Sequence, residues 1–205
     1  MKMETASVRR RRCGGLLRCV PRCGGFAALA AGVVVVGMGG CATTRATPAR
    51  VQERRSAEAE RLTHAASRIM ATDPERAEGM LREALAADAF HGPAHNNLGV
   101  LLLERGRLAE AAQSLERARQ LTPQHPDPRV NLGIALERAG RVDAAIEAYE
   151  AALEVHPDFL PAKQALARCQ LRYGRADDRT RGLLEAIALS GEEEWRAWAR
   201  MQLAK

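Results

Sequence analysis

The side chains that could do metal or acid–base chemistry in this chain are few and scattered. His91 and His95 are four residues apart, a spacing that on one helix would present two ligands to a metal ion. Gly92 and Pro93 stand between them, so we expect the two histidines to straddle a loop and the start of a helix. The other three histidines are isolated from one another: His64, His125 and His156. We predict no metal site.

The nucleophiles and carboxylates are not arranged for catalysis either. The sequence has no HExxH, no nucleophile elbow and no phosphate-binding glycine loop. Glu147 and Glu150 are three residues apart, as expected on a solvated helix face. The serines beyond residue 50 have no evident base near them: Ser56, Ser67, Ser114 and Ser190. We expect the chain not to be an enzyme and to use no cofactor and no small-molecule substrate.

The composition limits the fold and the partners. A chain of 205 residues forms one domain, or one domain plus a processed leader. Only 3% of the residues are aromatic, so the core must be built from Ala and Leu, which argues against a β-sandwich. The formal net charge of +6 comes wholly from residues 1–40, where seven basic side chains face the single Glu4. The remainder is neutral, so we predict no nucleic-acid partner.

Residues 1–40 have the order of a secretory signal. Four arginines at 9–12 precede an uncharged stretch, 23–44, whose apolar centre is FAALAAGVVVVGM. An uncleaved membrane anchor is the alternative, because 22 uncharged residues are enough to cross a bilayer. Several glycines dilute the hydrophobicity of this stretch and count against the anchor. We predict a signal peptide over residues 1–40.

The end of this apolar stretch, Met38-Gly39-Gly40-Cys41, resembles the lipobox of bacterial lipoproteins. The resemblance implies a lipid on the Cys41 thiol, cleavage before Cys41, and acylation, for example with palmitate, of the new amine. Several acyl chains on one residue give durable membrane anchoring. Ala42 follows rather than Asp, which by the sorting rule of that family implies the outer membrane, facing the periplasm. Residues 41–57 are then expected to be the lipidated end and a tether.

A period of 34 residues dominates the sequence from about residue 58 onward. It separates three glycines, Gly106, Gly140 and Gly174. The same period relates Gly99 to Gly133, Pro123 to Pro157, and the alanines Ala84, Ala118, Ala152 and Ala186. A fixed period of this length is the signature of a repeat architecture in which each unit is one supersecondary motif.

The segments NNLGVLLLERGRLAEAAQSLERARQLTP and VNLGIALERAGRVDAAIEAYEAALEVHP resemble tetratricopeptide repeats. The resemblance covers residues 58–193, with clear units at 92–125 and 126–159 and degenerate units at 58–91 and 160–193. It implies an all-α fold, a right-handed α-solenoid of helix-turn-helix repeats. Gly99 and Gly133 would let the two helices of a unit approach closely, and Gly106, Gly140 and Gly174 would turn the chain with a positive φ.

The last residues, 194–205, are expected to form a C-terminal capping helix. Ser190-Gly191-Glu192-Glu193 has the pattern of a capping box that opens this helix. Trp195 and Trp198 fall three residues apart on one face of it. We favour an interpretation in which the two rings cover the last repeat; the alternative is that they bind a partner.

In tetratricopeptide repeats the first helix of each unit lines the concave face, which implies a set of partner-binding residues here. Asn97 and Asn131 stand where asparagines of some family members grip the backbone of an extended peptide, because an amide both donates and accepts. Arg168 and Arg172 are one turn apart and could meet a carboxylate. The alternative, equally open, is that these side chains are solvated. The full set is Asn97, Val100, Leu103, Asn131, Ile134, Arg138, Arg168 and Arg172, with Glu104 and Glu137 on the same helices.

Together these features favour a membrane-anchored scaffold that binds a protein or peptide partner of the cell envelope, as an accessory or assembly factor. Lipoproteins with these repeats serve pili, secretion and cell-wall turnover, and nothing in the residues selects one of them. The alternative is a structural subunit that packs through its convex face or its C-terminal helix.

Overall fold

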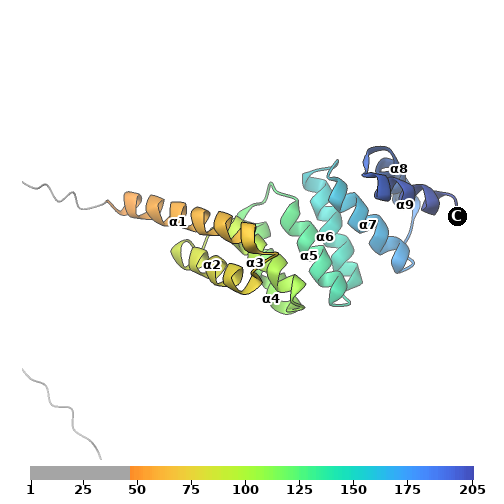
Figure 1. The fold of residues 1–205 in the computed structure, drawn as a ribbon. Coiled ribbons are helices and arrows are strands. Elements are labelled where there is room, and N and C mark those ends of the chain that lie inside the picture. The colour runs from red at the N-terminus through yellow and green to blue at the C-terminus, as the bar shows by residue number, and fades with distance from the viewer. Residues whose placement is uncertain (1–46) are drawn as a thin grey trace, which may run out of the picture. The chain divides into compact units, whose positions relative to one another are not determined.

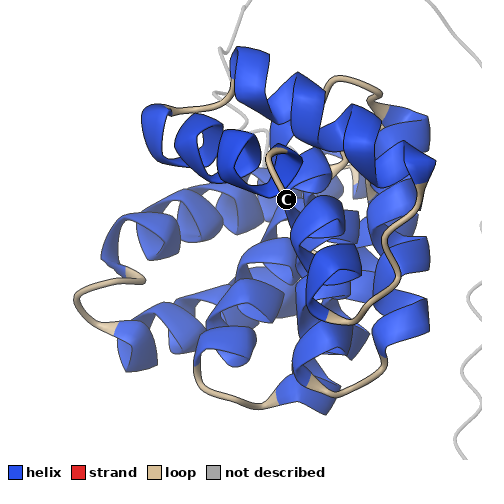
Figure 2. Ribbon diagram, turned by 90° about the vertical axis from the view of Figure 1, so that its right-hand side faces the viewer, coloured by secondary structure: helices blue, strands red, loops and turns tan. Residues whose placement is uncertain are grey.

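The computed structural model describes residues 47–205, and within that range all regular structure is helical (Figures 1 and 2). The helices in this range are α1 (Pro48–Ile69), α2 (Pro74–Ala87), α3 (Gly92–Glu104), α4 (Leu108–Leu121), α5 (Asp127–Arg138), α6 (Val142–Val155), α7 (Leu160–Arg172), α8 (Asp178–Ser190) and α9 (Glu193–Leu203).

The helices are organised as four hairpins and a final helix. α1 packs on α2, α3 on α4, α5 on α6 and α7 on α8, and each hairpin contacts the next one along the chain (Figure 1). α9 packs on α8 and closes the series. An all-α solenoid of helical hairpins with a C-terminal capping helix is therefore confirmed.

Glycine turns the chain inside three of the four hairpins. Gly106, Gly140 and Gly174 have φ angles of +73°, +77° and +66°, in the left-handed region that disfavours residues with a Cβ. Each follows the C-cap residue of a first helix, and the next residue donates its N–H back into that helix, for example Arg107 N to Leu102 O at 2.9 Å. The positive φ predicted from the 34-residue period is confirmed.

The first helix begins earlier than the predicted start of the repeats. Thr47 is the N-cap of α1, and Pro48 occupies the first turn, where its fixed φ suits a helix. Residues 48–57 are therefore helical, and this part of the predicted tether is wrong. The Ser56 hydroxyl donates to Asp88 at 2.8 Å, which ties the early part of α1 to the chain between α2 and α3.

The predicted capping box at Ser190 is also wrong. Ser190 is the last residue of α8, and the N-cap of α9 is Glu192, whose side chain makes no capping hydrogen bond. A capping box exists one helix earlier. The Asp177 carboxylate accepts from the backbone N–H of Thr180, and the Thr180 hydroxyl accepts from the backbone N–H of Asp177, both at 2.9 Å.

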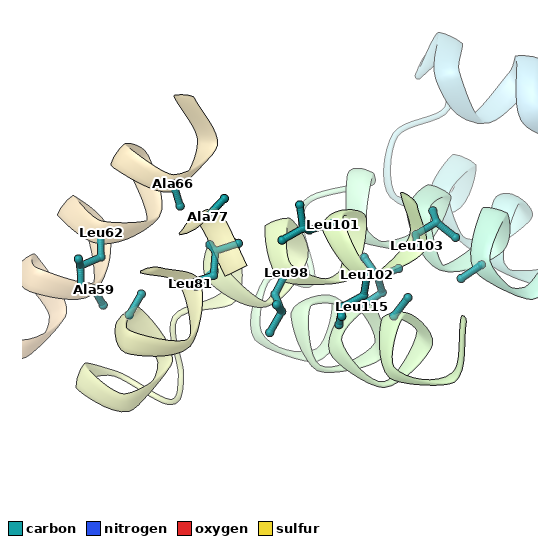
Figure 3. Close-up of a cluster of buried hydrophobic side chains, with 14 residues drawn as sticks. Ala59, Leu62, Ala66, Ala77, Leu81, Leu98, Leu101, Leu102, Leu103 and Leu115 are labelled. Carbon is teal, nitrogen blue, oxygen red and sulfur yellow. The ribbon is translucent and has the colours of Figure 1, made fainter. Parts of the chain in front are cut away.

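The core consists of three clusters of small and medium side chains. The first extends from α1 to α5 and is made of alanines and leucines, among them Ala59, Ala66, Leu81, Leu101 and Leu115 (Figure 3). The second surrounds Tyr149, and the third joins α7, α8 and α9. Such small side chains let helices approach closely, as the low aromatic content predicts.

Two glycines lie where the two helices of a hairpin approach each other closely. A Cβ on Gly133 would lie less than 3.0 Å from three ring carbons of Tyr149, and one on Gly99 would lie equally close to the Leu115 side chain. The predicted role of Gly99 and Gly133 in close packing is confirmed.

Candidate functional site

The first helices of the hairpins form one continuous row. α1 contacts α3, α3 contacts α5, and α5 contacts α7, whereas the second helices α2, α4, α6 and α8 make no comparable contacts with one another. The stack is therefore tighter on the side of the first helices, and we call this side the inner face. The partner-binding residues predicted from the sequence all belong to α3, α5 and α7.

Neighbouring first helices are joined by polar contacts between residues 35 apart, one more than the repeat length. Asn131 donates its amide to the Asn96 side chain at 3.0 Å. Arg138 donates to the backbone carbonyl of Leu103 at 3.1 Å. A third contact of the same spacing runs from Arg172 to Glu137, at 2.9 Å. Three of the predicted binding residues therefore also hold the repeats together.

On α3 the predicted residues differ in accessibility. Leu103 is 5% exposed and belongs to the first core cluster, so its side chain offers almost no surface to a partner, and that part of the prediction is wrong. It packs inward because α3 is surrounded by α1, α2, α4 and α5. Asn97 and Val100 are half-buried, and Glu104 is exposed. The Asn97 side-chain oxygen accepts a hydrogen bond from Asn96 at 3.3 Å.

A hollow of about 240 Å³ lies where α3 and α5 begin. Asn131 lines it, together with Asn96 rather than Asn97. Asn96 was missed by the sequence analysis, which followed the 34-residue period, whereas contacts between first helices follow a spacing of 35. We call this the asparagine hollow; it is lined by Gly92, Pro93, Asn96, Thr122, His125, Asp127, Pro128 and Asn131.

A second hollow, of about 340 Å³, lies where α5 and α7 end. It brings together four of the predicted residues with two others, Glu137 and Tyr173. We call it the arginine pocket; it is lined by Ile134, Glu137, Arg138, Arg168, Arg172 and Tyr173. Three arginines and a single glutamate line it, so the side chains around the pocket carry a net positive charge.

Glu137 is the buried centre of this pocket. It is only 6% exposed, and it accepts from Arg172 on one oxygen and from the Tyr149 hydroxyl, at 3.0 Å, on the other. Burial, followed by the nearby Glu137 charge, raises the pKa of Tyr149 above its ordinary value. The same two causes raise the pKa of the Cys169 thiol to about 11. Both groups therefore stay neutral under physiological conditions, and Cys169 is not activated as a nucleophile.

The histidines lie as the sequence predicts. His91 is the N-cap of α3 and His95 lies inside that helix, so they do not form a two-ligand face. Among residues 47–205, no cluster of three or more His, Cys, Asp or Glu side chains is arranged to hold a metal ion.

The C-terminal tryptophans are packed against the solenoid. Trp195 and Trp198 are half-buried and contact each other edge to face, with ring centroids 5.3 Å apart. Both pack against the third cluster, which includes Ala167, Leu184 and Ile187. This placement agrees with the interpretation of α9 as a cap.

The predicted signal peptide, 1–40, and the predicted lipid-attachment residue, Cys41, lie outside the described residues. Between residues 47 and 205, no helix combines the length and the apolar character needed to cross a bilayer.

Two family models of the tetratricopeptide repeat match the chain, one over residues 62–126 and the other over residues 136–202. No curated protein matches it in sequence.

Solved structures share its fold. A variant of the O-GlcNAc transferase of Thermobaculum terrenum is 28% identical over 65% of this chain, with a TM-score of 0.60, but the match spans only 26% of the transferase chain. MamA of Desulfovibrio magneticus is 20% identical over 73% of this chain and 79% of its own, with a TM-score of 0.55. The first repeat domain of Spaghetti (RPAP3), bound to an HSP90 peptide, is 18% identical over 58% of this chain and 95% of its own, also with a TM-score of 0.55.

Proposed function

This chain is a tetratricopeptide-repeat protein, and we propose that it is a membrane-anchored scaffold that binds a protein partner on the inner face of its repeats. The partner is a protein or an extended peptide of the cell envelope. The chain acts as an accessory or assembly factor and not as an enzyme. Its match to the transferase covers about a quarter of that protein, so the activity of the transferase is not carried over.

One observation carries the proposal. Asn131, Ile134 and Arg138 lie three and four residues apart, on one stripe of α5. Asn131 lines the asparagine hollow at one end of this stripe, and Arg138 lines the arginine pocket at the other. A single extended segment lying along α5 would therefore reach polar side chains in both hollows.

The comparison with RPAP3 supports a peptide as the kind of partner. That protein presents the same kind of repeat fold to a peptide of HSP90. At 18% identity the likeness concerns the fold alone, so it supports a peptide as the kind of partner and identifies neither the peptide nor the face that binds it.

The anchoring half of the proposal rests on the sequence. A basic segment, an apolar stretch and the Met38–Cys41 pattern stand in the order that a lipoprotein precursor needs. The lipid on Cys41 would hold the repeats at the surface of the outer membrane, facing the periplasm. We expect intact-mass spectrometry of the native protein to show a chain that starts at a lipidated Cys41. A chain that retains residues 1–40 would contradict the anchor, and Cys41→Ser should leave an unlipidated precursor.

The inner face can be tested by site-specific photo-crosslinking in the producing cells. A photoreactive amino acid at Glu104 or Arg138, both exposed on first helices, should form an adduct with the partner. The matched controls are Gln113 and Glu147, which are exposed on the second helices α4 and α6. Adducts from the controls alone would exclude binding on the inner face.

One observation favours the alternative, a structural subunit that packs through its C-terminal end. Leu189 is 82% exposed on α8 and Met201 is 53% exposed on α9, and exposed apolar side chains of this size are common at protein interfaces. A photoreactive residue at Leu189 separates the two functions. An adduct there, without one at Glu104 or Arg138, would establish the alternative.

A further inference from the structure

The side of α1 that faces away from its neighbours carries a line of arginines. The opposite side packs on α2 and α3 and contains the buried residues of this helix, Ala59, Leu62, Thr63 and Ala66. At 3.6 residues per turn, four arginines fall within an arc of about 40° that lies roughly opposite the buried set. We call them the α1 stripe; its members, all exposed, are Arg50, Arg54, Arg61 and Arg68.

Most of the charge in the α1 stripe has no counter-charge. Arg61 pairs with Glu58 at 2.5 Å, but both side chains are exposed, and such a pair is weak. The other three arginines of the stripe form no ion pair with any residue in the range 47–205. By comparison Arg181, which is exposed on α8, has Glu185 one turn away at 3.3 Å. The stripe therefore presents a line of positive charge, about 27 Å long, to an anionic partner.

The charge of α1 also differs in sign from that of the remaining described chain. α1 contains five arginines and three glutamates, a net charge of +2. The rest of residues 47–205 contains 18 basic and 21 acidic side chains, a net charge of −3. An anionic surface therefore attracts α1 and repels the remainder of the solenoid.

α1 is the helix closest in sequence to the predicted lipid. Cys41 precedes the N-cap Thr47 by six residues, and six residues span at most about 20 Å. A bilayer that holds Cys41 is therefore within that distance of the first turn of α1. α1 has 22 residues against 14 in α2, and its early turns extend past α2, where no other described helix covers them (Figure 1).

We propose that the α1 stripe binds the phosphate headgroups of anionic lipids, so that α1 lies along the membrane surface that holds the lipid on Cys41. This inference rests on the proposed function, because the lipid is what brings α1 to the bilayer. The apolar side of α1 is packed against the solenoid, so the contact is electrostatic and no apolar face enters the bilayer. Basic side chains next to an anionic membrane are attracted to it one by one, without a shaped pocket.

The experiment measures how close α1 lies to the bilayer in the native protein, purified from membranes and added to vesicles. A donor dye is placed on Ala57→Cys, an exposed position of α1, and an acceptor dye on the lipid headgroups. Cys169 is buried, so the new thiol is the accessible one among the described residues. The vesicles contain phosphatidylcholine alone or an equal mixture with phosphatidylglycerol, which is anionic. We expect more energy transfer with the mixture, and loss of the difference at high salt.

Paired variants test whether the stripe is responsible. Arg50→Gln with Arg54→Gln should lower the ratio of docked to undocked protein by about fivefold for each arginine removed. Arg50→Lys with Arg54→Lys should keep the transfer, because the attraction depends on charge. Glu58→Gln should raise it, since this change removes a flanking carboxylate and the counter-charge of one arginine. The matched control, Arg179→Gln with Arg181→Gln, removes the same charge from exposed positions of α8 and should leave the transfer unchanged.

Flotation with the same vesicles separates this inference from the lipid anchor. If the protein floats with both kinds of vesicle but the transfer is equal in both, or the variants of α1 and α8 behave alike, the inference is overturned and the anchor stands. Flotation only with phosphatidylglycerol, lost in Arg50→Gln with Arg54→Gln, would support the stripe and contradict the anchor. Flotation with neither kind would overturn both.

Discussion

The Tyr149 hydroxyl donates to the Glu137 carboxylate at 3.0 Å, so a residue of the second core cluster positions the charged group at the centre of the arginine pocket. The same ring lies against Gly133. α6 therefore holds α5 in two ways, by close packing on a glycine and by a hydrogen bond one turn further along. Because Arg172 binds the other oxygen of Glu137, the packing of one hairpin also fixes an arginine of the next.

The contact between Gly133 and Tyr149 predicts that Gly133→Ala destabilises the protein. The new Cβ would lie less than 3.0 Å from ring carbons that are themselves buried, and overpacking of this kind costs about 1–3 kcal/mol. The matched control is Gly79→Ala in α2, where a Cβ would meet nothing within 4 Å. That substitution should stabilise the helix by about 0.5–1 kcal/mol. Urea unfolding of both variants tests the pair, and changes of the same sign would contradict the packing described here.

Because the Cys169 thiol is buried, we predict that the free energy of unfolding falls at alkaline pH. Its thiol ionises in the unfolded chain near pH 8.5, whereas burial raises its pKa in the folded protein to about 11. The unfolded state therefore loses its proton first, and the free energy of unfolding falls as the pH rises through this window. The decrease between pH 8.5 and pH 10 should be about 1.5 kcal/mol. The free energy of unfolding of the Cys169→Ala variant, measured by urea unfolding, should fall less with pH over the same range. An equal fall in the variant and the unchanged protein would contradict the prediction.

The junction at Glu78 predicts an unequal effect of two similar substitutions. Glu78→Gln removes the carboxylate that binds Arg82, Arg105 and Arg107, and should cost about 1–3 kcal/mol. Glu110→Gln removes an exposed carboxylate that also pairs with Arg107, and should leave the melting temperature unchanged. Equal shifts of the melting temperature would show that burial does not distinguish the two carboxylates.

The sequence predicts the repeats and their turns because both depend on local chemistry. A positive φ at Gly106, and the close approach at Gly133, follow from the absence of a Cβ at regular intervals. The inner face is less well predicted. The 34-residue period identifies equivalent residues, but contacts between neighbouring first helices join Asn96 to Asn131 and Leu103 to Arg138, with a spacing of 35. That offset comes from how the hairpins stack, which the period does not contain.

The start of α1 is also poorly predicted from the sequence. Residues 48–57 are small, polar or charged, as expected of a tether, and most of them are exposed in the structure. They are helical because Thr47 and Pro48 start a helix, and because that helix continues into the buried face of Ala59 and Leu62. Composition alone does not separate a tether from an exposed helical extension.

The last prediction concerns the C-terminal cap. Trp195 and Trp198 pack against the third cluster, so replacing both with Ala should expose the apolar end of α7 and α8. The rings are half-buried, and we expect a cost of about 1–3 kcal/mol, below that of fully buried tryptophans. Hydrogen exchange should show the loss of protection in α8 and α9, with α1–α4 unaffected, because each repeat contacts only its neighbours. Partner capture by the inner face should persist in this variant. If stability is unchanged and capture is lost, the tryptophans bind the partner and do not cap the solenoid.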